Sequence, residues 1–246
     1  MMFGWIRKNK RNILETGLLE GMTDIHSHLL PGVDDGAQSK EEAIGILKYL
    51  ASYGVKRSWL TPHIMADLPR NEPEHLQKRL NDLMEVYPKD MPELRLAGEY
   101  MLDARFKNHC TKGLLTLANG HVLVETSYLS PSLNMGEIFR ELCLDAYTPI
   151  IAHPERYLYM EEAYYFSLKR MGCLFQLNLM SLSGLYGKRV KQRAYFMLKK
   201  GLYDFLGTDI HQLKTYQREM GNLFISVEEE NLLKGLLGNN TRLWTE

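Results

Sequence analysis

The stretch MTDIHSH at residues 22–28 is a short β-prone run that leads directly into two histidines, His26 and His28. The same arrangement recurs along the chain, because short β-rich runs alternate with segments of helical periodicity and most of the runs end in a polar residue. This alternation indicates parallel strands that are joined by right-handed crossovers. We predict strands at residues 22–26, 55–61, 94–99, 122–126, 149–152, 174–178 and 205–208.

Segments of helical periodicity lie between these strands and after the last one, and Ser39 is a suitable N-cap for the first helix. Gly54, Gly172 and Gly201 stand just before strands, where a helix commonly ends on a glycine with left-handed backbone. We predict helices at residues 40–53, 72–87, 104–118, 135–146, 161–171, 189–200 and 228–237.

The strand and helix units fit either a doubly wound open sheet or an irregular barrel. Polar residues stand at the carboxyl ends of all the predicted strands except the sixth, and a closed barrel brings these ends together around one mouth. An open sheet would scatter several of them, so we predict an α/β barrel. The sequence contains no linker, repeat or low-complexity tract. We therefore expect an N-terminal extension at residues 1–21 and a single domain at residues 22–246.

The composition is that of a packed globular protein, with 45% hydrophobic and 24% charged residues among 246. Thirty basic residues balance thirty acidic ones, which leaves no electrostatic footprint for nucleic acid. Cys110, Cys143 and Cys173 are an odd number without CxxC spacing. We expect reduced thiols in a cytoplasmic protein rather than disulfides or a thiolate zinc site.

The first eleven residues place Phe3, Trp5 and Ile6 beside several lysines and arginines. They lack the apolar region and the cleavage site of a secretory signal, and no run approaches the roughly 18 apolar residues that span a bilayer. Aromatic side chains with positive charge could give this segment a weak contact with a membrane surface. The alternative is a frayed terminus.

Histidines and carboxylates gather at the predicted strand ends. Residues i and i+2 of an extended strand point the same way, so His26 and His28 can present two imidazoles to one ion. Mixed imidazole and carboxylate ligands suit Mn²⁺, Fe²⁺ or Zn²⁺, whereas oxygen ligands alone would suit Mg²⁺ or Ca²⁺. We expect His75 and His109 to be exposed on helices and His121 to precede its strand. The remaining candidate ligands are Asp35, His63, Glu99, Glu125, His153, Asp209 and His211.

The order of the motifs is more specific than any one of them. HxH at residues 26–28, DDG at 34–36, TPH at 61–63, a strand-end glutamate, AHPERY at 152–157 and GTDIH at 207–211 together resemble the PHP-type (polymerase and histidinol phosphatase) protein-tyrosine phosphatases of bacterial capsule and exopolysaccharide systems. The resemblance spans residues 22–211. It implies a distorted (β/α)7 TIM-like barrel that holds up to three metal ions, with Mn²⁺ favoured and Fe²⁺ or Zn²⁺ as alternatives.

The resemblance also implies a role for each candidate ligand. The implied ligands of a first metal are His26, His28, Glu99 and Asp209. Glu99 would bridge to a second metal, whose other ligands would be Glu125 and His153. The implied ligands of a third metal are Asp35, His63 and His211. The match favours Asp35 over Asp34 as a ligand, so we expect Asp34 to support the site without binding the ion.

Arg156 resembles the arginine with which the family binds phosphate, since a guanidinium can fork onto two phosphoryl oxygens. The alternative is an ion pair with Glu155 or Glu161. His211 or a metal-bound water would protonate the leaving group. Weaker candidates for a second phosphate contact are Lys188, Lys214 and Arg218. Further candidates for the mouth of the site are Arg70, Tyr100, Tyr128, Tyr157 and Tyr186, although each tyrosine fits ordinary core packing equally well.

The sequence and the resemblance together predict a metal-dependent protein-tyrosine phosphatase that acts on the tyrosine-rich tail of a bacterial autokinase. One alternative is a hydrolase of a small phosphate ester such as histidinol phosphate, and another is a non-catalytic metal-bound phosphotyrosine-binding scaffold. Cysteine-dependent phosphatase chemistry needs an arginine six positions after the cysteine. Those positions hold Thr116, Pro149 and Leu179, which excludes that chemistry.

Overall fold

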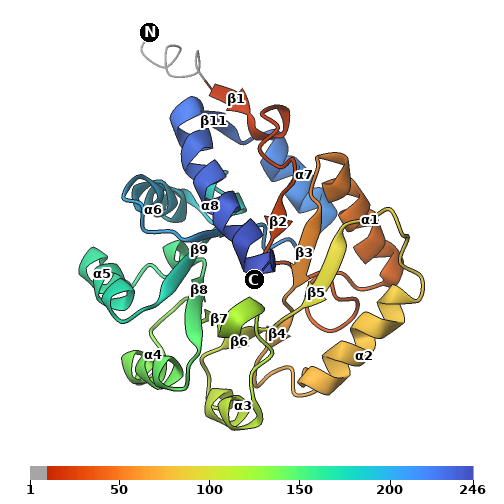
Figure 1. Cartoon of the computed structure of the whole chain (residues 1–246). Helices are drawn as coiled ribbons and strands as arrows, with labels where there is room; N and C mark the ends of the chain where they lie inside the picture. Colours follow the sequence, from red (N-terminus) through yellow and green to blue (C-terminus); the bar gives the residue numbers. More distant parts are fainter. Residues whose placement is uncertain (1–9, 246) are drawn as a thin grey trace.

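The computed structural model describes residues 10–245. Among these residues, two parallel sheets form the centre of the molecule (Figure 1). The larger sheet contains, in spatial order, β10 (Phe205–Gly207), β9 (Leu174–Asn178), β8 (Thr148–Ala152), β7 (His121–Glu125), β6 (Glu99–Met101) and β4 (His63–Ile64). The smaller sheet contains β2 (Thr23–Asp24), β3 (Arg57–Leu60) and β5 (Glu93–Leu96). The parallel α/β architecture is therefore confirmed.

Helices surround the strands in Figure 1. They are α1 (Lys40–Ser52), α2 (Pro73–Met84), α3 (Phe106–Lys112), α4 (Met135–Leu144), α5 (Glu162–Arg170) and α6 (Lys188–Lys199). The side chain of Ser39 accepts a hydrogen bond from Glu42 N, which confirms the predicted N-cap. Gly54, Gly172 and Gly201 have positive φ, as expected. No helix among the described residues is long and apolar enough to cross a membrane.

Two strand runs pass from one sheet to the other. The predicted strand at 94–99 is instead two strands, because β5 belongs to the smaller sheet and β6 to the larger one. Gly98 allows the change, since a Cβ there would lie 2.4 Å from Ile64 Cδ1. In the same way the run after Leu60 continues as β4. A single parallel bridge between Ser27 and Ile210 links the sheets, so the pairings within residues 10–245 form two sheets rather than one continuous ring.

The helical expectations need three corrections. The predicted helix at 104–118 is only α3, because Gly113 ends it with positive φ. Helix α7 (Leu213–Gly221) was not predicted, although Tyr216 and Met220 on its buried face have helical spacing. Helix α8 (Val227–Thr245) is longer than expected because its second half packs across the strands.

The segment before Met22 packs against the rest of the chain. β1 (Lys10–Asn12) pairs antiparallel with β11 (Phe224–Ser226), and Ile13, Leu18 and Leu19 are buried. The expectation of a frayed terminus, which covered residues 1–11, is therefore wrong for Lys10 and Arg11 of β1. Lys10 and Arg11 form ion pairs with glutamates of α8 at 3.0 and 2.7 Å, which engages two of the charges expected to meet a membrane. Phe3, Trp5 and Ile6 lie outside the described residues.

Asn240 of α8 joins the first and last strands of the main alternation. Its Nδ2 donates to Thr23 O at 2.8 Å and to Leu206 O at 2.6 Å, and its Oδ1 accepts from Leu206 N at 3.2 Å. We expect Asn240→Ala to lower the free energy of unfolding by about 2–4 kcal/mol, because these buried backbone groups would lose a partner. Chemical denaturation measures this. Asn239→Ala is the matched control, since Asn239 donates to Asp204 O alone among the described residues, and equal losses in both variants would contradict the role of Asn240.

Candidate metal centre

His26 and His28 follow β2 and point into the same space, as the HxH spacing predicts. Their Nε2 atoms lie 3.1 Å apart, and both side chains are fully buried. Ser27 points the other way and donates its hydroxyl to Trp59 O at 2.8 Å. The alternation of an extended chain thus places two imidazoles together and turns the intervening residue toward the smaller sheet.

Glu99, the first residue of β6, and Asp209, which follows β10, complete a compact group with these histidines. Glu99 Oε2 lies 3.3 Å from both Nε2 atoms, and Asp209 Oδ1 lies 3.4 Å from that of His26 and 3.2 Å from that of His28. Ligand atoms about 2.0–2.1 Å from a tetrahedral ion lie about 3.3–3.4 Å from one another. These spacings are close to that value, and His26, His28 and Asp209 form one group with metal-ligand spacing, whereas Glu99 belongs to the groups that contain His153 and Glu125.

A second group forms around the other side of Glu99. His153 Nε2 lies 3.0 Å from Glu99 Oε1, while His63 Nδ1 lies 3.0 Å from Glu99 Oε2 and 2.8 Å from Glu125 Oε1. Glu99 therefore uses its two oxygens toward different histidines, as a bridging ligand would. The resemblance pairs Glu125 with His153, whereas the structure groups Glu125 with His63 and Glu99.

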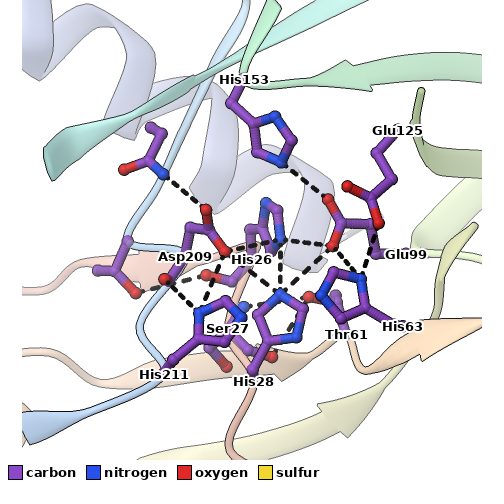
Figure 2. Close-up of polar contacts among 12 residues, drawn as sticks. His26, Ser27, His28, Thr61, His63, Glu99, Glu125, His153, Asp209 and His211 are labelled. Atoms are coloured by element: carbon purple, nitrogen blue, oxygen red, sulfur yellow. Dashed lines mark hydrogen bonds and ion pairs between the residues drawn. The ribbon is translucent and has the colours of Figure 1, made fainter. Parts of the chain in front are cut away.

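The third group lies nearest to solvent. Asp35 Oδ1 is 3.5 Å from His63 Nε2 and 3.3 Å from His211 Nε2, and the rings of His28 and His211 stack at 3.9 Å. Figure 2 shows how the side chains from separate strands converge. Four groups with metal-ligand spacing together contain all nine expected ligands, namely His26, His28, Asp35, His63, Glu99, Glu125, His153, Asp209 and His211.

The buried side-chain oxygen and nitrogen atoms of this cluster are better placed to bind a cation than to form hydrogen bonds with one another. Glu99 Oε2, Glu125 Oε1 and His63 Nδ1 are buried and make no hydrogen bond with any residue that the structure describes. A buried polar atom without a partner costs about 1–3 kcal/mol, and more when it is charged. Oxygen and nitrogen atoms that lie about 3 Å apart without hydrogen-bond geometry are expected where they coordinate the same cation. The mixed donors suit a first-row transition metal.

The electrostatics of the cluster lead to the same conclusion. Burial opposes the ionisation of Glu99 and Asp209, yet the charge of His26 and other imidazoles holds the pKa of both carboxyls well below their usual values. Burial also opposes a charge on His28, but Asp34, Asp209 and Glu99 raise its pKa well above the usual value. The same carboxylates that favour a proton on these imidazoles would favour a bound cation in its place.

Neighbouring side chains orient the histidines. Asp34 Oδ2 lies 2.8 Å from His28 Nδ1 and accepts from His63 N at 3.1 Å. Asp34 belongs to none of the four metal-spaced groups, and its contact with His28 fits the prediction that it supports the cluster. Gln176 Oε1 lies 3.0 Å from His26 Nδ1. Such contacts fix which ring nitrogen faces a metal.

Sequence reasoning assigned no polar residue to the end of the sixth predicted strand, β9, and therefore missed Gln176 and Asn178. Both are fully buried, and Asn178 Nδ2 donates to Asp209 Oδ2 at 2.6 Å. Two amides at positions i and i+2 of an otherwise apolar strand were the available signal.

The backbone at two of the expected ligands is strained. His153 and Asp209 have φ of 36° and 50°, which lie in the left-handed region that residues with a Cβ rarely adopt. Asp209 N donates to His26 O at 2.8 Å, and His153 N donates to Gln176 O at 3.0 Å. These bonds hold both residues at the strand ends, where stored strain commonly marks a functional site.

A pocket of about 460 Å³ opens over the cluster. Arg156 reaches into it between the rings of Tyr128 and Tyr186, whose centroids lie 4.3 and 4.1 Å from its guanidinium carbon. Arg156 Nη1 also donates to Asp209 Oδ2 at 3.2 Å. The guanidinium therefore lies beside the cluster, and the alternative ion pairs with Glu155 or Glu161 are absent among the described residues. The apolar walls of the pocket include Met65, Met101, Met180 and Leu185.

Several expected residues lie elsewhere. Tyr100 and Tyr157 are fully buried, and Arg70 lines a separate pocket with His75 and Arg79. His109 is 6% exposed and lies against the Tyr100 ring, so the expectation of an exposed residue is wrong; α3 turns it inward. Lys188, Lys214 and Arg218 are not among the lining residues of the pocket over the cluster, and Arg218 pairs with Glu219 at 2.9 Å. His75 is exposed and His121 begins β7, near where each was expected.

An α/β fold with parallel strands whose carboxyl ends carry clustered histidines and carboxylates defines a protein with a candidate multinuclear metal centre. The chain belongs to the family described as capsular polysaccharide synthesis, CpsB/CapC, whose model matches residues 22–234.

Curated relatives match most of the chain. The tyrosine-protein phosphatase YwqE of Bacillus subtilis (strain 168) is 29% identical over 205 residues, which cover 79% of each chain. The putative tyrosine-protein phosphatase CapC of Staphylococcus aureus is 28% identical over 214 residues, which cover 82% of each chain. A solved structure from work on YwqE of B. subtilis and CpsB of Streptococcus pneumoniae, described as unique metal-dependent tyrosine phosphatases, has a TM-score of 0.77 and 25% identity and covers 91% of this chain and 94% of its own.

Proposed function

We propose that this protein is a metal-dependent protein-tyrosine phosphatase. The observation that carries the proposal is the convergence of nine histidines and carboxylates in metal-spaced groups, with Arg156 bound to one of them, Asp209, at 3.2 Å. Family membership supports it, because relatives bear the name tyrosine-protein phosphatase.

The expected ligands would hold up to three ions, with Mn²⁺ preferred and Fe²⁺ or Zn²⁺ as alternatives. When bound, such ions lower the pKa of a coordinated water toward neutrality and act as Lewis acids toward the phosphoryl group. The ligands of the first ion would be His26, His28, Glu99 and Asp209. Those of the second would be Glu99, Glu125 and His153, with His63 close enough to share it, and those of the third would be Asp35, His63 and His211.

The protein's own residues would bind the phosphoryl group and assist the leaving group. Arg156 would offer its free N–H groups to the phosphoryl oxygens, where a planar fork suits two of them. His211 donates a hydrogen bond from Nδ1 to Asp209 O at 3.0 Å, so only its Nε2 is available to the leaving group. That nitrogen either binds a metal or donates a proton to the phenolate, and these roles exclude each other in any one step.

The walls of the pocket favour an aryl substrate. Met65, Met101, Met180 and Leu185 line the pocket over the metal-spaced groups, and Tyr128 and Tyr186 flank Arg156. A phenyl ring gains free energy by leaving water for such surfaces, whereas a small polar ester would gain little.

A substrate panel tests the proposal against its two alternatives. The Mn²⁺-loaded protein is incubated with a phosphotyrosine peptide, a phosphoserine peptide and histidinol phosphate, and released phosphate is measured. We expect the phosphotyrosine peptide to give the largest kcat/KM. A preference for histidinol phosphate would establish a small-ester hydrolase instead, and binding of the phosphotyrosine peptide without phosphate release would establish a scaffold.

We further propose that the two sheets are parts of a distorted (β/α)7 barrel, because the Ser27 to Ile210 bridge and Asn240 connect β2 with β10. Residues 22–246 would form its single domain. The substrate would be the tyrosine-rich tail of a bacterial autokinase that controls capsule or exopolysaccharide export, in the cytoplasm.

Chelation should inactivate the protein, and Mn²⁺ should restore activity.

Alkylation of the thiols should change activity less than about twofold, because burial raises the pKa of Cys110 and Cys143, and that of Cys173 to about 12. Phosphate release and metal content are measured together after iodoacetamide treatment. Loss of activity at full metal content would contradict a mechanism without a thiol.

A further inference from the structure

Asn178 lies at the end of β9 and is held on several sides. Its backbone N donates to Glu155 Oε1 at 3.1 Å, and its Oδ1 accepts from Met180 N at 2.9 Å. The first contact holds the backbone, and the second fixes the plane of the side-chain amide. The amide nitrogen then donates to Asp209 Oδ2 at 2.6 Å and to the Tyr186 hydroxyl at 3.1 Å. Asn178 is fully buried, so water does not compete for these contacts.

The carboxylate of Asp209 is divided between two environments. Oδ1 faces the imidazoles of His26 and His28 at 3.4 and 3.2 Å. Oδ2 faces Asn178 and Arg156 at 2.6 and 3.2 Å. A buried carboxylate oxygen needs donors to offset its lost hydration. Oδ2 receives one neutral donor and one charged donor.

Arg156 touches the same two groups that Asn178 holds. Its guanidinium donates a single hydrogen bond to Asp209 among the described residues, and it stacks on the Tyr186 ring at 4.1 Å. The remaining N–H groups have no hydrogen-bond partner in residues 10–245, and Arg156 lines the pocket over the cluster. Asn178 lies behind this arrangement and is not among the residues that line the pocket.

We propose that Asn178 is a positioning residue for Arg156: it supplies Asp209 Oδ2 with a neutral N–H and thereby leaves the guanidinium fork free for the phosphoryl group. The inference rests on the proposed phosphatase function. Without the amide, the buried oxygen would draw Arg156 into a two-bond pairing with Asp209, which is the geometry that guanidinium and carboxylate prefer. The N–H groups used in that pairing would be lost to the substrate.

Glu155 holds the backbone of Asn178 in place. Its Oε1 accepts from Asn178 N and its Oε2 accepts from the Tyr203 hydroxyl at 2.9 Å. Glu155 is the chain neighbour of Arg156 but points away from it into the core, where it is fully buried. The turn at residues 154–156 therefore anchors Asn178 with one side chain and presents Arg156 with the next.

The test measures the binding of inorganic phosphate to the Mn²⁺-loaded protein by calorimetry, together with metal content. We expect Asn178→Ala to weaken phosphate binding about tenfold, the factor that corresponds to one hydrogen bond to a charged group, at unchanged metal content. Asn239→Ala is the control, because Asn239 is an amide of α8 that donates to Asp204 O and contacts neither Asp209 nor an expected metal ligand among the described residues. It should leave both metal content and phosphate binding as they are in the wild type.

A double-mutant cycle separates positioning from general damage. In the Arg156→Ala background, Asn178→Ala should have no further effect on phosphate binding, because its influence passes through the guanidinium. An undiminished effect in that background, or metal loss that accounts for the weakened binding, would overturn the proposal. Asn178→Asp keeps the shape if the alanine variant fails to fold, and it should weaken phosphate binding more, since a second carboxylate would compete for Arg156. A wild type that binds phosphate but hydrolyses no phosphotyrosine would refute the proposed function and leave this measurement interpretable.

Discussion

Asp209→Asn should reduce turnover by about 10³-fold or more and lower the metal content of the purified protein. Asp209 Oδ1 lies within 3.4 Å of both His26 and His28, so the substitution removes a negative charge from the group that would enclose the first ion. Asparagine tolerates the left-handed backbone at this position, where alanine would add strain. The loss therefore reports on the charge. Phosphate release and elemental analysis measure the two effects.

Asp90→Asn provides the control for Asp209→Asn, because Asp90 is an exposed residue of a turn before β5. It should keep full activity and metal content. A variant Asp209→Asn with normal metal content and normal turnover would exclude Asp209 from the metal centre. His28→Ala should behave like Asp209→Asn, since His28 is equally buried in the same group.

Arg156→Ala should cost about 10²-fold or more in kcat/KM while metal content stays normal. The side chain has one hydrogen bond to Asp209, and Asn178 continues to hold that carboxylate, so the metal ligands keep their places. The loss arises because the charge that spreads over the phosphoryl oxygens during transfer has no guanidinium to balance it. Steady-state kinetics with a phosphotyrosine peptide measure it, and Arg156→Lys should recover only part because an ammonium lacks the planar fork.

Arg140→Ala is the control for Arg156→Ala, since Arg140 is an exposed residue of α4 that lies away from the pocket. Its kinetics should match the wild type. Full activity in Arg156→Ala would remove this residue from the site, and a parallel loss of metal would show that it acts by supporting the ligands.

Local features of the sequence were sufficient to predict much of the fold. Ser39 caps α1 as expected because a cap depends on contacts within one helical turn. The strand at 94–99 was misassigned because its division depends on a distant residue, Ile64, whose side chain leaves no room for a Cβ at position 98. Periodicity within the run contains no information about that neighbour.

The candidate site divides in the same way. His26 and His28 face one space because alternation along an extended chain requires it. The association of Glu125 with His63 and Glu99 depends instead on the register of β4, β6 and β7. The contribution of Asn178 depends on β9 lying beside β10, which brings the amide to Asp209.

The residues alone predicted which donor atoms are present, that parallel strands carry them at their carboxyl ends, and that imidazole is mixed with carboxylate. The folded chain was needed to show which ligands share a group, that Arg156 lies between two tyrosines, and that a buried amide holds the carboxylate behind it. Strand alternation and capping are set by bonds between near neighbours in the chain, whereas the spacing of strand ends is set by the packing of residues from across the whole core.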